Sequence, residues 1–352
     1  MISPHRRPTS ADVAMRAGVS RATVSMVLNG RTQGTVSEAN QQRVLEAAAE
    51  LGYTRSALAI SLKERRTRTI GLITDEIATS PFAGRMARAA SMAAARENYL
   101  VITMDLSLRE NTVDDAARLL AERQVDGLIY ATMGRIRVPV PKVPPGMPLV
   151  LLNCEIDDAD DAAAAGLTTF LPDDYGGARR AARRFAETGH RRIAMLSDDE
   201  SSEAGRAREA GFRDELAEYG IEPRIIAAGW QLDDGYRATA QLLAQTEPPT
   251  GLFCIRDRVA GGALHAAAAA GVEVPRDLSV IGFDDEDFFA ERLTPPLTTI
   301  ALPHEEMGER AMTSLLALLR GPLSGGGDLE ASPVIIECPL VERQSVASAP
   351  PL

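Results

Sequence analysis

The sequence predicts an all-helical N-terminal head followed by a two-lobed α/β body with parallel sheets. Three observations predict this architecture: a short helical pattern within the first 53 residues, an alternation of β-branched runs with alanine-rich stretches after residue 69, and a length of 352 residues. Because a chain of this length exceeds one ordinary domain, we expect more than one hydrophobic core.

Two short helices joined by a tight turn are predicted in the head. The run from Asp12 to Asn29 has apolar residues at helical spacing; Gly18 tolerates the positive φ of a turn, and Ser20 is placed to cap the second helix. The positions expected to face inward are Val13, Val19, Val24 and Leu28. The positions expected to face outward are Arg21, Ala22 and Ser25 or Met26. This pattern is typical of a recognition helix that reads DNA bases, although a generic helical hairpin has the same spacing.

Short strands alternate with helices in the body. Strands are expected at 70–74, 100–104, 127–130, 149–153, 192–196, 251–255 and 279–283, and helices at 82–97, 112–123, 175–188, 205–219, 235–245 and 257–270. Strands separated by helices form right-handed crossover units and parallel sheets covered on both faces, and the length favours two lobes over one wide sheet. Ligands of such sheets bind beyond the carboxyl ends of the strands, so the loops there are the expected binding residues.

Formal charge is distributed unevenly along the chain. Residues 1–68 contain eleven Lys and Arg against five Asp and Glu, a charge of +6, so the total of -11 requires -17 on the other 284 residues. A basic head neutralises DNA phosphates while an acidic body stays off the DNA. An arginine-rich tail with no DNA partner would give the same imbalance, so charge alone leaves both interpretations open.

The composition, 45% hydrophobic and 25% charged, is typical of a globular protein in water. No apolar run reaches the roughly 18 residues that a membrane-spanning helix requires, and the N-terminus lacks the apolar core of a secretion signal. We therefore expect a cytoplasmic protein with no membrane partner. Cys154, Cys254 and Cys338 are widely spaced among apolar neighbours, which favours buried thiols over disulfides or metal ligands.

No catalytic, cofactor or metal site is predicted. The four histidines lack metal-ligand spacing, and the glycine pairs at 176–177 and 261–262 do not form a phosphate-binding or dinucleotide motif. The acidic run 284–287 lacks the glycine turn and terminal glutamate of a calcium loop, so a solvated loop is the preferred interpretation. We therefore do not expect an enzyme.

Ordered motifs run through the whole chain. Residues 12–30 contain Asp-Val-Ala, Ala-Gly-Val-Ser, Thr-Val-Ser and Val-Leu-Asn-Gly, and residues 43–53 read RVLEAAAELGY. The body contains RTIGLI at 68–73, VIGFDD at 280–285, PPLTTI at 295–300 and LVER at 340–343. In this order the motifs resemble the LacI/GalR family of bacterial transcriptional repressors, and the resemblance covers nearly the whole chain.

The resemblance implies three parts. These are a helix-turn-helix DNA-binding domain at 1–53, a hinge helix and linker at 54–68, and an effector-binding and dimerisation domain at 69–346. The last part is expected to be a two-lobed sensor with a periplasmic-binding-protein-like fold, in which the chain crosses between lobes near Phe170, Ile300 and Ser332. The short tail after Arg343 lacks the heptads of an added tetramer-forming helix, so a homodimer is expected.

The resemblance also implies which residues meet DNA. A leucine matching Leu62 enters the minor groove from a hinge helix that forms only on the operator. The chain departs from the family pattern at two places. Arg55-Ser56 stands where the family usually has Pro-Asn, which implies a looser hinge start or an added phosphate contact. Met26 stands where the family often has arginine, which leaves the operator sequence open. The positions matched to DNA contacts or helix caps are Thr9, Ser20, Arg21, Ala22, Thr23, Ser25, Met26, Asn29, Ala59 and Leu62.

An effector site between the lobes is implied as well. Arg208 matches an arginine that binds sugar hydroxyls, Asp284 an acid that accepts hydroxyl bonds, and Trp230 an aromatic that stacks on a sugar ring. The alternatives are a surface helix position for Arg208 and a core position for Trp230. The other matched positions are Asp75, Ser80, Phe82, Asn153, Arg256 and Asp257.

Arg256 departs from the family pattern, which often has asparagine there. The added cation favours an anionic or acid sugar, or it forms a salt bridge with Asp257 or Asp285; the salt bridge is the preferred interpretation.

The function implied by the resemblance is sequence-specific repression. The affinity of the protein for a pseudo-palindromic operator would be controlled by a small-molecule effector, a mono- or disaccharide. Induction is preferred over co-repression, and the residues do not decide between them. The alternatives are a solute-binding protein of a sugar transporter, which shares the two-lobed fold but not the head, and a sugar-active enzyme, which would need paired carboxylates.

Overall fold

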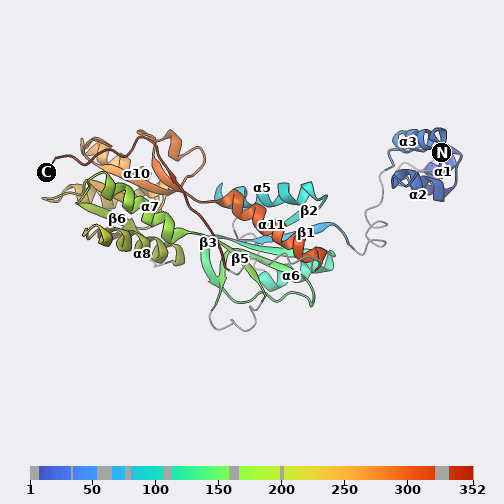
Figure 1. The fold of residues 1–352 in the computed structure, drawn as a ribbon, viewed down its shortest axis with the longest axis horizontal. Helices are drawn as coiled ribbons and strands as arrows, with labels where there is room; N and C mark the ends of the chain where they lie inside the picture. Colours follow the sequence, from blue (N-terminus) through green and yellow to red (C-terminus); the bar gives the residue numbers. More distant parts are fainter. Residues whose placement is uncertain are drawn as a thin grey trace. The chain divides into compact units, whose positions relative to one another are not determined.

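The computed structural model describes residues 8–32, 35–53, 66–75, 81–106, 112–157, 166–198, 202–321 and 333–351. It forms two compact units, Met1–Thr67 and Arg68–Leu352, and Figure 1 labels many of their helices and strands. Four predicted site positions fall outside the described residues: Ala59, Leu62, Ser80 and the side chain of Phe82.

The described part of the first unit is a three-helix bundle made of α1 (Ser10–Ala17), α2 (Arg21–Leu28) and α3 (Glu38–Glu50). One residue from each helix, Val13, Val24 and Val44, is fully buried at the centre of its apolar core. Gly18 ends α1 with a left-handed φ of 66°, which turns the chain sharply into α2. The predicted pair of helices with a glycine turn is confirmed.

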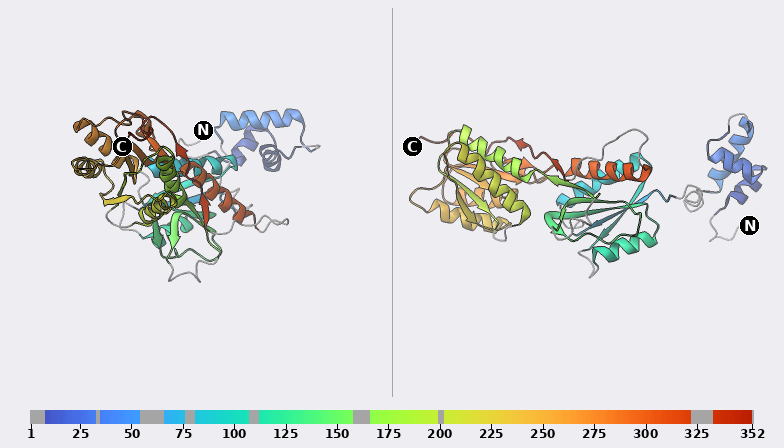
Figure 2. Two further views of the ribbon diagram at one scale, coloured as in Figure 1. Left: turned by 60° about the vertical axis from the view of Figure 1, so that its left-hand side comes forward. Right: turned by 60° about the horizontal axis from the view of Figure 1, so that its bottom comes forward.

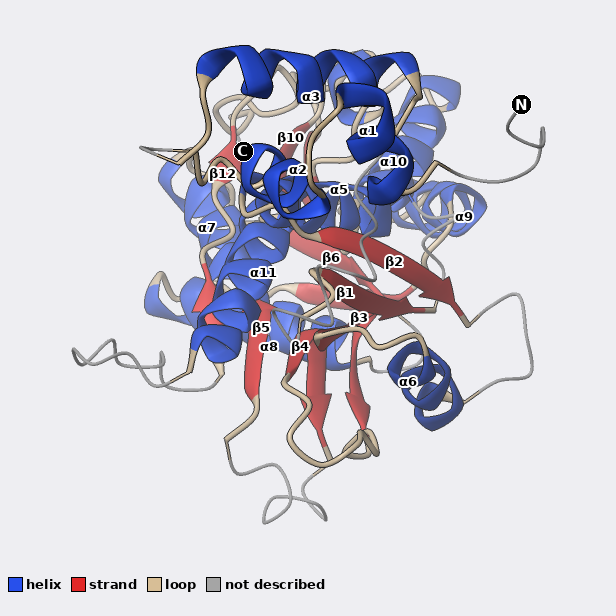
Figure 3. Cartoon of the chain, turned by 90° about the vertical axis from the view of Figure 1, so that its right-hand side faces the viewer, coloured by secondary structure: helices blue, strands red, loops and turns tan. Residues whose placement is uncertain are grey.

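Two six-stranded sheets form the second unit, and each belongs to one lobe. The sheet of lobe 1 has the order β11-β5-β4-β3-β1-β2, and its described strand pairs are all parallel. Its strands are β1 (Thr69–Thr74), β2 (Leu100–Asp105), β3 (Gly127–Val138), β4 (Leu149–Ile156), β5 (Thr168–Pro172) and β11 (Val334–Ile336). Its helices are α5 (Pro81–Arg96), α6 (Val113–Glu122) and α11 (His304–Arg320). Figure 3 shows this sheet from β5 to β2 with α6 and α11 beside it.

Lobe 2 repeats this arrangement with the order β12-β10-β9-β8-β6-β7, in which only the described pair β10–β12 is antiparallel. Its strands are β6 (Ile193–Ser197), β7 (Arg224–Ala227), β8 (Gly251–Cys254), β9 (Ser279–Asp284), β10 (Thr298–Ala301) and β12 (Leu340–Val341). Its helices are α7 (Asp174–Glu187), α8 (Glu203–Glu218), α9 (Leu232–Leu243), α10 (Asp257–Ala269) and the short 3₁₀ helix η2 (Ala290–Arg292).

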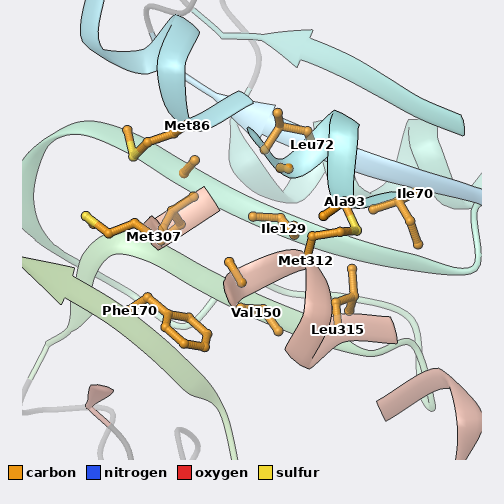
Figure 4. Close-up of a cluster of buried hydrophobic side chains, with 14 of the residues drawn as sticks. Ile70, Leu72, Met86, Ala93, Ile129, Val150, Phe170, Met307, Met312 and Leu315 are labelled. Carbon is orange, nitrogen blue, oxygen red and sulfur yellow. The ribbon is translucent and has the colours of Figure 1, made fainter. Parts of the chain in front are cut away.

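Helices cover both faces of each sheet. Alternate residues of a strand point to opposite faces, so both sets of side chains are buried. In β1 of lobe 1, Ile70 and Leu72 pack against α5 and α11, whereas Ile73 packs with residues of α6. Figure 4 shows the first of these clusters, in which Met86 of α5 and Met312 of α11 cover the sheet. In lobe 2, α9 and α10 cover one face, while α7 and α8 cover the other.

The chain crosses between the lobes three times: between β5 and α7, between β10 and α11, and between β11 and β12 (Figure 2). The first two crossings follow the expected positions Phe170 and Ile300 within a few residues, and the third lies beyond Ser332. Because β5 and β10 leave their lobes at their carboxyl ends, those ends of both sheets lie at the junction between the lobes. The predicted two-lobed parallel α/β fold is confirmed.

Candidate functional site

The helix ends of the head are fixed by side-chain caps. Thr9 and Asp12 form a reciprocal capping box at the start of α1, in which the Thr9 N–H donates to Asp12 Oδ2 at 2.7 Å. Ser20 Oγ accepts the Thr23 N–H at 3.0 Å and caps α2. At the other end of α2, the Asn29 amide donates to Ser25 Oγ at 3.1 Å. These bonds fix the start of α1 and both ends of α2.

The outer side of α2 carries the predicted DNA-facing residues. Arg21, Ala22, Ser25 and Met26 are all exposed, as expected for side chains that reach base edges. Thr23 is half-buried, and its hydroxyl lies 2.9 Å from Ser20 Oγ.

The inward-facing residues of α2 differ in part from the prediction. Val24 is buried as expected, but Val27 is buried where Leu28 was expected, and Leu28 and Val19 are only half-buried. The apolar side of α2 is therefore turned slightly from the position that the sequence pattern predicts.

In lobe 1, two predicted effector residues bind the backbone of β3. Asp75 Oδ1 accepts the Met133 N–H at 2.9 Å. Asn153 is buried with a left-handed φ of 62°, and its amide donates to the carbonyl oxygens of Thr132 at 3.0 Å and Met133 at 2.9 Å. Asp75 directly follows β1, whereas Asn153 was expected at a strand end and instead lies within β4, which continues to Ile156.

In lobe 2, Arg208 is only 4% exposed and is fixed on three sides. Its Nε donates to Asp174 Oδ1 at 2.9 Å, and its Nη1 donates to the Ile255 carbonyl oxygen at 2.6 Å. Its guanidinium carbon lies 3.6 Å from the centre of the Phe283 ring. The alternative of a surface helix arginine is wrong, because α8 directs this side chain to the carboxyl ends of β8 and β9.

Asp284 lies between two guanidinium groups at the end of β9. Its Oδ1 is 3.7 Å from Arg208 Nη1 and its Oδ2 is 3.4 Å from Arg256 Nε. Burial raises the pKa of Asp284 to about 6, although Arg208 and Arg256 both favour the charged carboxylate. The expected salt bridge of Arg256 is present with a different partner: it pairs with Asp284, whereas Asp285 pairs with Arg343 at 2.7 Å.

Asp257 is fully buried, and both of its carboxylate oxygens accept hydrogen bonds. The donors are the Thr299 hydroxyl at 2.5 Å and the Glu286 N–H at 2.8 Å. Burial raises its pKa well above the usual value, and the neighbouring Asp284 raises it further. Trp230 is half-buried between β7 and α9 and packs against the apolar core of lobe 2.

A cavity of about 510 Å³ lies at the junction of the lobes, next to the loop that follows Asp284. It is lined by Gly84, Arg85 and Arg88 of α5, by residues 285–288, and by Glu291 and Arg343. Among the predicted effector residues whose side chains the structure describes, none lines this cavity. Its charges are largely paired, since Arg85 binds Glu305 at 2.7 Å and Arg343 binds Asp285.

Asp174, the partner of Arg208, was missed by the sequence analysis. It is fully buried in the first turn of α7, where the pattern of an exposed helix start does not distinguish it from Asp173.

The three cysteines are buried as predicted, and burial raises the pKa of Cys154 to about 12. Within the described ranges, no cluster of three His, Cys, Asp or Glu is arranged to hold a metal ion. The described helices include none that is long and apolar enough to span a membrane.

Fold and sites together define a class of protein: a helix-turn-helix unit with an exposed recognition helix, combined with a two-lobed α/β unit whose polar side chains gather at the junction of the lobes. Residues 9–56 match the lacI family of bacterial regulatory proteins, and residues 182–346 match a periplasmic binding protein-like domain.

Whole-chain relatives agree with these matches. The HTH-type transcriptional repressor PurR of Erwinia tasmaniensis is 33% identical over 347 residues, which cover 97% of this chain and 98% of that protein. A Lac repressor dimer bound to operator and the anti-inducer ONPF superimposes with a TM-score of 0.75 at 25% identity, over 97% of this chain and 100% of that one. A CelR–cellobiose complex superimposes with a TM-score of 0.63 at 28% identity, over 96% and 100% of the two chains.

This chain belongs to the LacI/GalR family of bacterial transcriptional repressors. It is a DNA-binding transcriptional regulator controlled by a small-molecule effector.

Proposed function

We propose that this protein represses transcription from a pseudo-palindromic operator and that a mono- or disaccharide, bound between the lobes, changes its operator affinity. The observation that carries the proposal is the placement of Arg208 and Asp284 together at the carboxyl ends of β8 and β9. An arginine supplies fixed donors and a carboxylate supplies acceptors, which are the groups that sugar hydroxyls need. The CelR–cellobiose complex supports a sugar as effector.

DNA binding is assigned to residues 1–53 and the hinge to 54–68. The exposed residues Arg21, Ala22, Ser25 and Met26 at the start of α2 support base reading, and the +6 charge of residues 1–68 supports binding to phosphates. The body at 69–346 binds the effector and a second copy of the chain. Because operator DNA is chromosomal, the site of action is the cytoplasm, and the protein performs no catalytic step.

A homodimer is supported by an exposed apolar edge on lobe 1. Strand β2 forms one edge of the sheet, and Leu100 and Ile102 on it are 64% and 37% exposed. Met92 on α5, the helix that packs beside β2, is 53% exposed. Exposed apolar strand edges favour pairing with another chain, and the related Lac repressor is a dimer on its operator.

The proposal is tested in two steps with the full chain. First, operator sequences are selected from a random DNA library, and their affinity is measured as salt rises; a regulator that contacts phosphates loses affinity steeply, whereas a solute-binding protein selects no sequence. Second, the fluorescence of Trp230, the only tryptophan, is titrated with mono- and disaccharides, sugar acids and nucleosides. A saturable change with a sugar supports the proposal, and a response to nucleosides or acids alone contradicts the sugar assignment.

A further inference from the structure

Strand β3 contains a wide irregularity beside its partner β4. Ala131 pairs with Leu152 and Ile136 pairs with Cys154, so residues 132–135 stand opposite Asn153 alone. The irregularity is held by the bonds of Asp75 and Asn153 to its backbone and by the Thr132 hydroxyl, which donates to the Asn153 carbonyl oxygen at 2.7 Å. A bulge of this kind re-aims the side chains that follow it.

The side chain at the end of the bulge is Arg135, which reaches from lobe 1 to lobe 2. Its Nε donates to Glu155 Oε1 on the neighbouring strand at 2.6 Å. Its Nη1 donates to Asp174 Oδ2 on α7 at 3.4 Å. The Arg135 side chain is 18% exposed, so both bonds are largely shielded from water. The planar guanidinium therefore joins a carboxylate of each lobe.

Asp174 completes the connection. Its other oxygen, Oδ1, accepts the Nε–H of Arg208 at 2.9 Å, and the carboxylate is 0% exposed. It lies directly after the first crossing, where β5 of lobe 1 leads into α7 of lobe 2. One buried carboxylate is thus shared by an arginine from each lobe, and removing either arginine would leave the buried charge less compensated.

We propose that Arg135 is a positioning residue that fixes Arg208 from the opposite lobe through Asp174. This inference rests on the proposed function in one respect, that Arg208 binds the effector. If the lobes separate, Arg135 leaves Asp174, water reaches the carboxylate, and the Asp174 contact that helps to orient Arg208 weakens. The donors offered to an effector therefore depend on the arrangement of the lobes, and a bound effector favours the arrangement in which Arg135 is engaged.

The test measures the chemical accessibility of Arg208 and needs no effector. Phenylglyoxal, which modifies accessible arginines, is reacted with the full chain, and the rate at each arginine is followed by peptide mass spectrometry. The variants are Arg135→Gln, Asp174→Asn, Arg135→Lys and Arg137→Gln. Arg137 is the matched control, since it lies on the same strand and its Nε donates to Glu203 Oε1 of lobe 2 at 3.2 Å. Arg118 on α6, whose side chain is 60% exposed, supplies the reference rate in every variant.

Arg208 should react about tenfold faster in Arg135→Gln than in the parent chain, because one charge-assisted hydrogen bond to Asp174 is lost. Asp174→Asn also weakens the direct bond to Arg208, so its rate should be at least as high. Arg137→Gln should match the parent chain. Arg135→Lys keeps the charge but cannot contact both carboxylates in the same way, so the Arg208 rate in this variant should lie between the rates in the parent chain and in Arg135→Gln. The lysine variant also keeps the test available should the glutamine variant not fold.

An unchanged Arg208 rate in the Arg135 variants, or an equal acceleration in Arg137→Gln, would overturn the proposal. Failure of the sugar assignment would show only in the Trp230 titration, so the two results are independent.

Discussion

Arg208 and Asp174 form a buried ion pair at the point where the chain first passes from lobe 1 to lobe 2, with Nε and Oδ1 2.9 Å apart. The Arg208 guanidinium lies flat against Phe283, which belongs to an aromatic group with Phe253 and Phe212. Its orientation is therefore determined by Asp174 of α7, by Phe283 of β9 and by the Ile255 carbonyl oxygen directly after β8. An arginine held in this way presents its remaining donors in a fixed direction.

Replacing Arg208 should separate effector response from DNA binding. Alanine would leave the buried Asp174 and Asp284 without this cation, at a cost of about 3–5 kcal/mol, so lysine is the better variant. In Arg208→Lys we expect unchanged operator affinity without effector and loss of the effector response, because lysine cannot bind Asp174 and the Ile255 carbonyl oxygen together. Arg206→Lys, a 54%-exposed side chain on the same helix, should respond normally. A responsive Arg208→Lys protein would remove Arg208 from the site.

The buried Asp284 predicts a pH dependence of stability. Burial raises its pKa in the folded protein to about 6, above the unfolded value of about 3.9. Stability from a raised pKa is fully present below the unfolded value and is lost as pH rises through the folded value. The Tm of the parent chain should therefore fall relative to that of Asp284→Asn between about pH 4 and about pH 6, and the difference should stay constant above that range. A Tm difference that does not vary with pH would contradict this expectation.

The Ser20 cap should stabilise α2, the recognition helix. Ser20→Ala removes the acceptor of the Thr23 N–H and should cost about 1 kcal/mol of helix stability. Hydrogen exchange of the α2 amides should accelerate, and operator affinity should fall. Ser37→Ala, which removes the corresponding cap of α3, is the control: it should accelerate exchange in α3 with a smaller effect on operator affinity. Equal loss of operator affinity in both variants would argue against a specific role of α2.

The apolar edge at β2 should be the dimer surface. Ile102→Asp places a charge on this edge and should shift the protein toward monomer in analytical ultracentrifugation. Ile335→Asp is the matched control, because Ile335 is 48% exposed on β11, the opposite edge of the same sheet. The account is contradicted if Ile335→Asp dissociates the dimer and Ile102→Asp does not.

The general architecture was predictable because it depends on local patterns. Val13 and Gly18 mark the head through helical spacing and a turn, and the β-branched runs mark seven of the strands. The sequence analysis missed β5, β7, β10 to β12 and α11. These strands are short, with two to five residues. Helix α11 begins directly after a proline with acidic residues in its first turn, and the strand before it, β10, had not been recognised.

The site was predictable only in part, because contacts across the fold leave no periodic signal. Arg208 and Asp284 were found through the family resemblance, Asp284 at the end of a strand motif and Arg208 within a helix. Arg135 was missed because the direction of its side chain depends on a bulge in β3. The predicted partner of Arg256 was wrong because the choice between Asp284 and Asp285 depends on the positive φ values of these two aspartates, 119° and 52°. No sequence pattern contains that information.

The most direct test of the central claim is an operator titration with and without a sugar. Fluorescence anisotropy of a labelled operator, selected by the full chain, is measured at fixed salt in the presence of the sugar that changes Trp230 fluorescence. We predict that this sugar changes operator affinity by about 5–150-fold, the usual range of coupling between two sites, and that it leaves non-specific DNA binding unaltered. A sugar that saturates the Trp230 signal while operator affinity stays constant would contradict the account.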